Sequence, residues 1–169
     1  SFADLQTAIA MILENFNYGK SGLLSRLFSP KIDKLMFAAT KADHITPEQH
    51  GNLVSLLNQL VYQTKQHLQY DTIKMKTLAI SSVKTTTAGK SVYQGNEVPV
   101  IQGRRDKDNK LITIFPGAVP AKLPKPSYWT EKGFNFVSFS PLQSLEPNTC
   151  LPHVRMDQVL QFLLGDKMR

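Results

Sequence analysis

The chain has 169 residues, of which 41% are hydrophobic and 20% are charged. This composition is typical of a globular protein and excludes intrinsic disorder, and no apolar run approaches the roughly 18 residues that a membrane-spanning helix needs. The single cysteine, Cys150, excludes an internal disulfide and a four-cysteine zinc site, and it favours a reducing, cytoplasmic setting. The net charge of +7 is localised, because residues 74–132 contain eleven Lys and Arg against four Asp and Glu. We therefore expect one basic surface on an otherwise balanced protein.

The first half of the chain predicts alternating helices and strands. Apolar residues at helical spacing predict a helix from Asp4 to about Gly19 and a shorter amphipathic segment at residues 23–28. The short apolar run at residues 35–39 then predicts a strand that is buried on both faces of a parallel sheet.

The helix that follows has the strongest signals in the sequence. Thr46 and Gln49 form a capping box around Pro47, and leucines continue the helical period as far as Leu68. Residues 77–81 predict a second buried strand. Strand, helix and strand form a βαβ unit, which places the carboxyl ends of both strands at the same edge of the sheet.

The second half of the chain favours β-structure. Eight of the ten prolines lie beyond residue 98, which disfavours long helices there. We expect a hairpin around a Gly-Asn turn within residues 92–98, strands at 111–115 and 134–139, and a proline-punctuated connection at 116–126. A last helix carries apolar residues from Met156 to Leu164 and is expected to end at Gly165.

Two triplets look like the end of a phosphate-binding loop. They are Gly19-Lys20-Ser21 and Gly89-Lys90-Ser91. A true loop needs another glycine five residues earlier, so that backbone amides can wrap the phosphates, and those positions hold Glu14 and Lys84. We therefore expect no phosphate-binding loop in this sequence.

A stronger signal follows the first predicted strand. Thr40-Lys41-Ala42-Asp43 lies at the sheet edge where ligands bind in open α/β proteins, and it differs by one residue from the Asn-Lys-x-Asp guanine motif of GTP-binding proteins. The Asp43 carboxylate can accept hydrogen bonds from N1–H and the 2-amino group of guanine, whereas adenine lacks both donors. The alternative interpretation is that Thr40 and Asp43 cap a turn and Lys41 is solvated.

A second segment follows the next predicted strand. Ser82-Val83-Lys84 resembles the Ser-Ala-Lys motif that closes the guanine pocket of GTP-binding proteins. By this resemblance Ser82 steadies the loop, the Val83 N–H donates to guanine O6, and Lys84 flanks the base opposite Lys41. The predicted nucleotide-binding residues are Thr40, Lys41, Asp43, Ser82, Val83 and Lys84.

With these motifs in place, the chain resembles the YcjX-like family of P-loop nucleotide-binding proteins, a group linked to stress responses. The resemblance is carried by residues 35–60, by residues 112–120 with Phe115-Pro116-Gly117, and by residues 155–166. It implies a protein that binds GTP or GDP with Mg²⁺, whose phosphate loop and magnesium ligands lie upstream of this sequence. No catalytic residue and no metal ligand is predicted here. Thr40 replaces the Asn of the motif, and its shorter hydroxyl ties the base loop to the phosphate loop less well.

The resemblance also implies the fold class, which is α/β. We expect part of a P-loop NTPase sheet at residues 1–85, a basic β-rich insertion at 86–152 and a packing helix at 153–169. The most basic loop of the insertion carries Arg104, Arg105, Lys107 and Lys110. These residues form either a solvated hairpin tip or a surface for an anionic membrane, nucleic acid or an acidic protein. In the second case the chain is a non-enzymatic interaction module; no sequence-specific nucleic-acid binding is predicted, because no aromatic residues interleave with the basic ones.

Overall fold

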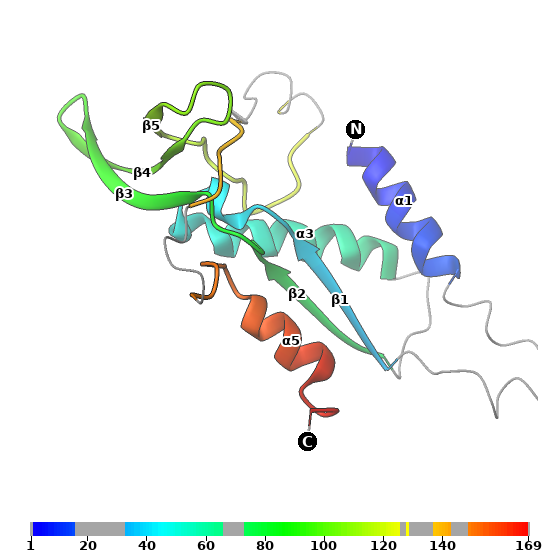
Figure 1. Cartoon of the computed structure of the whole chain (residues 1–169). Helices are drawn as coiled ribbons and strands as arrows, with labels where there is room; N and C mark the ends of the chain where they lie inside the picture. The colour runs from blue at the N-terminus through cyan, green and yellow to red at the C-terminus, as the bar shows by residue number, and fades with distance from the viewer. Residues whose placement is uncertain are drawn as a thin grey trace, which may run out of the picture.

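The structure, a computed structural model, describes residues 2–15, 33–65, 73–125, 128, 137–142 and 149–168. Two small sheets and three helices organise these parts of the chain (Figure 1). In chain order the elements are α1 (Phe2–Asn15), β1 (Lys34–Ala39), the 3-10 turns η2 (Ala42–His44) and η3 (Pro47–Gln49), α3 (His50–Lys65), β2 (Lys74–Ala79), β3 (Thr86–Tyr93), β4 (Asn96–Arg104), β5 (Leu111–Ile114) and α5 (Met156–Leu164).

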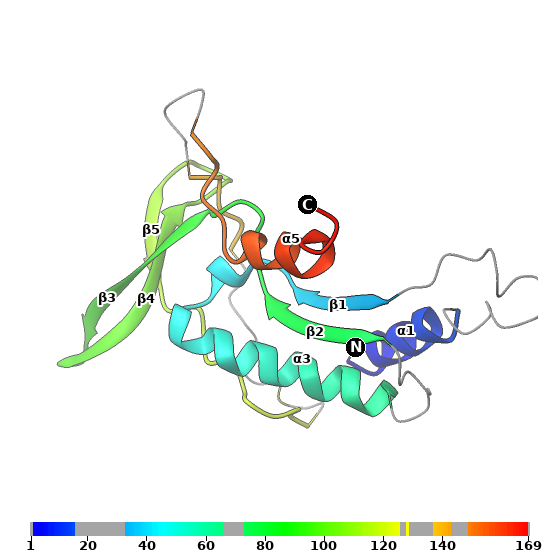
Figure 2. The same ribbon diagram turned by 90° about the horizontal axis from the view of Figure 1, so that it is seen from below.

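The predicted βαβ unit is confirmed. β1 and β2 pair in parallel, with Lys34 opposite Lys74 at one end and Ala39 opposite Ala79 at the other. Helix α3 covers one face of this sheet and α5 covers the other (Figure 2). Leu56, Leu60 and Val61 of α3 are buried, and so is Leu78 of β2. Both strands therefore end at one edge of the molecule, as the sequence predicts.

The second strand begins and ends earlier than expected. It runs from Lys74 to Ala79 instead of 77–81. The prediction missed the start of the strand because its first positions carry lysines and do not belong to an apolar run. The ammonium group of Lys76 lies 5.7 Å from the centroid of the Phe162 ring on α5. A lysine stem can cover apolar surface in this way, so a charged residue occupies an inner face of the sheet.

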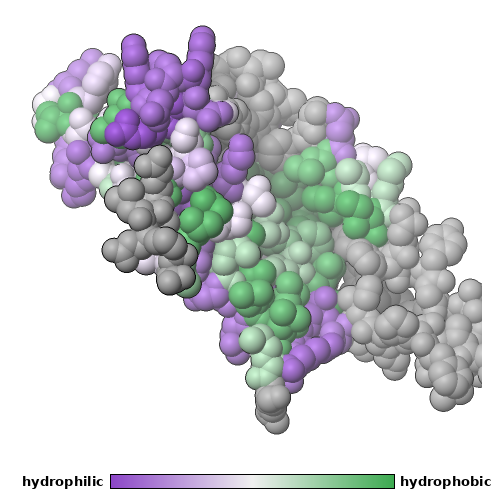
Figure 3. All heavy atoms as spheres, in the orientation of Figure 1, coloured by the Kyte–Doolittle hydropathy of each residue, from purple (hydrophilic) through white to green (hydrophobic). Residues whose placement is uncertain are grey.

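Helix α5 is held at its far end by an ion pair. The Lys34 ammonium lies 2.5 Å from Asp166 Oδ1, just beyond the helix. The helix ends at the predicted residue, but Gly165 has a right-handed backbone and not the left-handed one that usually stops a helix. Hydrophobic side chains gather over β1 and α5, whereas hydrophilic ones dominate over the antiparallel sheet (Figure 3). Leu160 and Leu164 of α5 are exposed.

The antiparallel sheet has the strand order β3-β4-β5. Its hairpin projects from the body of the molecule (Figure 1) and turns at Gln94 and Gly95, which have φ angles of 48° and 79°. Two consecutive left-handed residues suit a tight hairpin, so the turn lies one residue before the predicted Gly-Asn pair. The strand predicted at 134–139 is described only from residue 137, where Phe139 forms an isolated bridge with Arg105.

The proline-punctuated segment is an extended strap along α3. Polar side chains of the helix region bind its backbone at alternate residues: Gln49 Nε2 donates to Gly117 O at 2.9 Å, Asn52 Nδ2 to Val119 O at 3.0 Å, and Gln59 Nε2 to Ala121 O at 2.8 Å. The predicted capping box is therefore wrong. Thr46 makes no side-chain cap bond and α3 begins only at His50. The Gln49 amide reaches the Thr46 hydroxyl at 3.2 Å, not the Thr46 backbone N–H, and it also binds the strap.

Some expectations fall outside the described residues or differ from the structure. The segment at 23–28, the Gly19-Lys20-Ser21 triplet and the helix continuation to Leu68 are not described. Cys150, which the sequence favours as a small and at least half-buried side chain, is exposed. None of the helices in the described part of the chain combines the length and apolar character that a bilayer crossing requires.

Candidate functional site

Two loops meet where β1 and β2 end. The loop after β1 contains η2, and the loop after β2 contains residues 80–85. They are joined by a hydrogen bond from Ala42 N to Ile80 O at 2.9 Å. Between them lies a pocket of about 420 Å³, which we call the edge pocket. Its lining residues are Thr40, Lys41, Asp43, His44, Ile80, Ser81, Ser82, Val83, Thr85, Ser138, Phe139 and Met156.

The structure brings together most of the residues that the two motifs single out. Thr40, Lys41, Asp43, Ser82 and Val83 all line the edge pocket, although the motifs are about forty residues apart in sequence. Lys84 does not line it. Its backbone is instead tied on the outside, with Lys84 N donating to Pro152 O at 2.7 Å and Lys84 O accepting from Leu142 N at 2.9 Å.

Asp43 is the most deeply buried charged residue of the pocket, with 6% of its surface exposed. Its two carboxylate oxygens differ sharply. Oδ2 accepts from the Thr85 backbone N–H at 2.6 Å and from the Thr85 hydroxyl at 2.8 Å. Oδ1 is buried and has no hydrogen-bond partner among the described residues. A buried carboxylate oxygen without a donor is costly, so this oxygen marks a place where a hydrogen-bond donor belongs.

The ionisation of Asp43 follows from these contacts. Burial by itself raises the pKa of the carboxyl group, but the Thr85 N–H and the nearby hydroxyls of Ser81 and Thr85 outweigh it, and the pKa lies below its ordinary value. The Ser81 hydroxyl donates its single proton to Val83 O at 2.9 Å, so Oδ1 still has no donor among the described residues. The pKa of the neighbouring His44 is also lowered, first by burial and then by Lys41, against the opposing charge of Asp43. The pocket at neutral pH therefore presents an ionised carboxylate beside a neutral imidazole.

Lys41 adopts a left-handed backbone, with φ of 57° and ψ of 37°. This conformation is uncommon for a residue with a side chain. It turns the chain from β1 into η2, so that Ala42 and Asp43 point inward and are buried while Lys41 stays exposed at the rim. A buried carboxylate beside an exposed lysine is thus built into the first loop.

Sequence reasoning missed several residues of the edge pocket, among them Thr85, Phe139 and Met156. Thr85 holds Asp43, and its hydroxyl also lies 3.0 Å from His44 Nε2. Phe139 packs edge-on against His44, with ring centroids 5.5 Å apart, and Met156 comes from the first turn of α5. Only Thr85 had a local signal, because it directly follows the second motif. Phe139 and Met156 reach the site through tertiary contacts that no short motif encodes.

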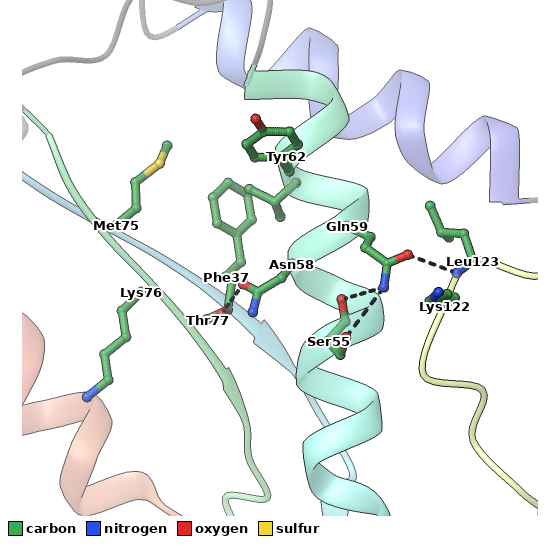
Figure 4. Close-up of a pocket in the computed structure, with 11 residues that line it drawn as sticks. Phe37, Ser55, Asn58, Gln59, Tyr62, Met75, Lys76, Thr77, Lys122 and Leu123 are labelled. Atoms are coloured by element: carbon green, nitrogen blue, oxygen red, sulfur yellow. Dashed lines mark hydrogen bonds between the residues drawn. The ribbon is translucent and has the colours of Figure 1, made fainter.

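A larger pocket in the described part of the chain lies elsewhere. It has a volume of about 750 Å³ and lies between α3, β2 and the strap (Figure 4). Some of its polar groups bind one another: the Thr77 hydroxyl donates to Asn58 Oδ1 at 2.5 Å, and Gln59 Oε1 accepts from Leu123 N at 3.2 Å. The edge pocket, which holds the unpartnered carboxylate oxygen, is therefore the better candidate site.

The other sequence signals have clear positions. Gly89-Lys90-Ser91 lies within the exposed strand β3, so its amides cannot wrap a phosphate group. The basic loop is the turn between β4 and β5. There Arg105 forms an ion pair with Asp108 at 2.5 Å, and Arg104 Nη1 donates to Asn109 O at 3.1 Å, so two of its four cations hold the turn together. The proposed anionic partner stays a prediction.

Comparison of the sequence with known proteins identifies its family. The model of the YcjX-like family, DUF463, matches residues 1–168. The chain belongs to the YcjX-like family. It is 44% identical over 169 residues to a protein of Escherichia coli K12 named Ras-like GTPase YcjX, covering 100% of this chain and 36% of that protein. It is 40% identical over 170 residues to a protein of the same name from Shewanella oneidensis, covering 99% and 35%. The chain thus spans about a third of the length of these relatives.

Proposed function

We propose that this chain supplies the guanine-recognition part of a P-loop protein that binds and hydrolyses GTP in its full-length form. One observation carries the proposal: Asp43 Oδ1 is buried at the edge pocket without a donor among the described residues. The pocket lies at the carboxyl ends of two parallel strands, where α/β proteins bind their ligands. The name of the two relatives, Ras-like GTPase, supports the same chemistry.

Guanine provides the donors that this carboxylate lacks. Its N1–H and 2-amino group both donate, whereas adenine presents an acceptor at N1 and no amino group at C2. In the proposed complex one donor binds Oδ1. The other takes Oδ2 in place of the Thr85 hydroxyl, which then donates to His44 Nε2 at 3.0 Å, with the imidazole proton moved to Nδ1. The pocket can therefore accept the base without stranding a polar group.

The remaining predicted residues have the following roles in the proposal. Lys41, exposed at the rim, covers one face of the base with its aliphatic stem. The Val83 N–H donates to O6, and Ser82 shapes the loop that carries it. Lys84 flanks the opposite face by moving its side chain, since its backbone is fixed. Thr40 connects the loop toward the phosphate-binding part of the protein.

The phosphate and magnesium chemistry belongs to other parts of the full-length protein. In the described ranges, no group of three or more His, Cys, Asp or Glu residues could hold a metal ion. Mg²⁺ neutralises charge on the phosphoryl groups during GTP hydrolysis. We propose the corresponding domain division: a nucleotide-binding core at 1–85, a β-rich insertion at 86–152 and a packing helix at 153–169.

Exchange of one carboxylate for an amide tests the proposal. In the full-length protein, Asp43→Asn should weaken GTP binding about a hundredfold, because two charge-assisted hydrogen bonds worth roughly 3 kcal/mol are lost. Binding of XTP should strengthen relative to GTP, since xanthine carries a carbonyl at C2 that an amide can donate to. The measurement is competitive binding of GTP, XTP and ATP at one Mg²⁺ concentration.

Asp33→Asn is the matched control. Asp33 is an exposed aspartate at the opposite end of β1, so its exchange should leave the nucleotide preference unchanged. A preference of the unmodified protein for ATP, or an unaltered preference in Asp43→Asn, would show that residues 40–43 are only a turn before α3.

A further inference from the structure

A buried histidine and an arginine connect the edge-pocket loop to the C-terminal segment. His50, in the first turn of α3, lies 2.7 Å through Nε2 from the backbone oxygen of Ala42. Its other ring nitrogen, Nδ1, lies 3.1 Å from Nη1 of Arg155. The same Nη1 donates to Ala79 O, the last carbonyl of β2, at 3.0 Å. One chain of hydrogen bonds therefore joins α5, α3, the end of β2 and the loop that carries Asp43.

The donors and acceptors fix the protonation state of this chain. A carbonyl oxygen only accepts, so the Nε2 of His50 must carry the proton that it donates to Ala42 O. A guanidinium only donates, so Nδ1 must be the bare acceptor. His50 is therefore neutral with its proton on Nε2. No exchange of roles between the two ring nitrogens satisfies both partners.

The contact to Ala42 O acts directly on Asp43. The Ala42 carbonyl and the Asp43 N–H belong to the same planar peptide unit, and the Ala42 N–H is already bound to Ile80 O. Residue 42 is thus held from both sides, by Ile80 in the loop after β2 at its amide and by His50 at its carbonyl. Fixing this peptide fixes the direction in which the chain enters Asp43.

We propose that His50 and Arg155 are positioning residues, which hold the Ala42–Asp43 peptide in the geometry that recognition of the guanine base requires; this inference rests on the proposed function. Arg155 lies directly before α5 and has a left-handed backbone with φ of 55°, which is uncommon for a residue with a side chain. From this position its side chain reaches His50 and Ala79 O. The C-terminal helix and the nucleotide site are coupled through this side chain.

Acid should release this pair. Burial lowers the pKa of His50, and the charge of Arg155 lowers it further, while the bond to Ala42 O and the charges of Asp43 and Glu48 oppose the shift. Protonation of Nδ1 removes the acceptor for Arg155 and places two cations side by side. Because the folded pKa lies below the ordinary 6.5, the pair is intact at neutral pH and is lost as the pH falls through that lower value.

The experiment uses the full-length protein and three variants. Arg155→Met keeps the apolar stem and removes the donor, and His50→Phe keeps the ring and removes both hydrogen bonds. Lys34→Met breaks the ion pair at the other end of α5 and is the control for general loosening of that helix. The affinities for GTP and ATP are measured from pH 7.5 down to pH 5.5, with thermal unfolding midpoints and the ring ¹⁵N shifts of His50.

Arg155→Met and His50→Phe should each weaken GTP binding about tenfold at pH 7.5, the equivalent of one lost charge-assisted hydrogen bond. Lys34→Met should leave the affinity unchanged despite a lower midpoint. The acid-dependent loss of GTP affinity in the unmodified protein should be absent from His50→Phe. In Arg155→Met, the His50 ring should titrate at a higher pH than in the unmodified protein.

Two results would overturn the inference and leave the proposed function standing. One is normal GTP affinity in both variants of the pair, and the other is a His50 ring protonated on Nδ1 at neutral pH. A failure of the unmodified protein to prefer GTP over ATP would overturn the proposed function itself, and it is recognised before any substitution is made. If Arg155→Met does not fold, Arg155→Lys, which keeps a charged donor, takes its place. It should show a smaller loss of GTP affinity, and any change in the pKa of His50 should be upward, as expected for Arg155→Met.

Discussion

The hydroxyl of Thr85 links the two loops of the edge pocket. It donates to Asp43 Oδ2, so it must accept from His44 Nε2, and the Thr86 hydroxyl next to it donates to the backbone oxygen of Asp43. These three hydrogen bonds, two of Thr85 and one of Thr86, therefore join the start of β3 to η2. This arrangement keeps Asp43 ionised in a buried position, where an isolated carboxylate would become neutral.

Thr85→Val should expose the contribution of this hydroxyl. Valine has nearly the same shape but no donor, so we expect the free energy of unfolding at pH 7 to fall by about 2 kcal/mol, as for a hydrogen bond to a charged group. The pKa of Asp43 should rise. Because the folded pKa is depressed, Asp43 stabilises the protein above its ordinary value of 3.8 and loses this effect as the pH falls through the folded value.

Urea unfolding of the full-length protein between pH 7 and pH 3 measures both effects. Thr87→Val, at an exposed position of β3, is the matched control and should change stability by less than about 0.5 kcal/mol. Equal losses in the two variants would mean that the Thr85 hydroxyl has no special relation to Asp43.

The sequence could predict the residue types of the site but not the contacts among them. Thr40 to Asp43 and Ser82 to Lys84 are short motifs next to strand signals, and parallel pairing of those strands brings the motifs together. Thr85 as the donor to Asp43 depends on the exact register of that pairing. His50 and Arg155 depend on the packing of three elements, and each alone has the appearance of an ordinary helix-start residue.

Among the elements, apolar patterning predicted α1, β1, α3, β5 and α5 close to their observed positions. It did not predict their burial, because Leu5 and Ile12 of α1 are exposed and β1 is at most half-buried. The strap at residues 117–123 is different, because polar side chains of α3 bind its backbone. A row of Gln, Asn and Ser on a helix has the appearance of a solvent-facing surface, so its partner was not predictable from the pattern.

Gln49, at the end of η3, makes two hydrogen bonds to the backbone of the strap. Its Oε1 accepts from Val119 N at 2.5 Å, its Nε2 donates to Gly117 O at 2.9 Å, and Val119 is buried. Gln49→Ala should therefore lower the free energy of unfolding by about 2 kcal/mol, since a buried backbone N–H loses its acceptor. Cleavage by trypsin at Lys122 should become faster as the strap loosens.

Gln158→Ala removes the same side chain from an exposed position on α5. It should leave both the stability and the rate of cleavage at Lys122 nearly unchanged. Similar behaviour of the two glutamine variants would show that the strap is held by its own conformation and not by α3.

At the scale of the whole molecule, the edge pocket is assembled from four separate parts of the chain. The loops after β1 and β2 line it together with Ser138, Phe139 and Met156 of α5. Residues 138–140 reach this position by pairing with Arg104, Arg105 and Asp106 at the end of β4. The antiparallel sheet therefore supports the pocket, although its hairpin projects away from it (Figure 1).

Gly103 is the point where this support is tightest. It lies in β4 and pairs with Thr86, and a Cβ atom there would lie 2.7 Å from Phe139 Cδ1 and 2.8 Å from the backbone oxygen of Thr85. Both neighbours belong to the edge pocket, and the Thr85 backbone cannot move without disturbing its bond to Asp43. A glycine is needed here for close approach and not for an unusual backbone angle.

Gly103→Ala in the full-length protein should therefore lower the free energy of unfolding by about 1–3 kcal/mol, the range for an overpacked site. It should also weaken binding of GTP and ATP together, because Phe139 and Thr85 shift while the guanine-specific carboxylate is retained.

Gly89→Ala is the matched control on the neighbouring strand. A Cβ atom at Gly89 meets only Val100 Cγ2 at 3.9 Å, so alanine should stabilise the hairpin by about 0.5 kcal/mol through a smaller loss of backbone entropy. Denaturant unfolding and nucleotide titration of both variants make the comparison. If Gly103→Ala is as stable as Gly89→Ala and binds nucleotide normally, then the antiparallel sheet and the edge pocket are independent, and the pocket lining at residues 138–139 is not needed for the site.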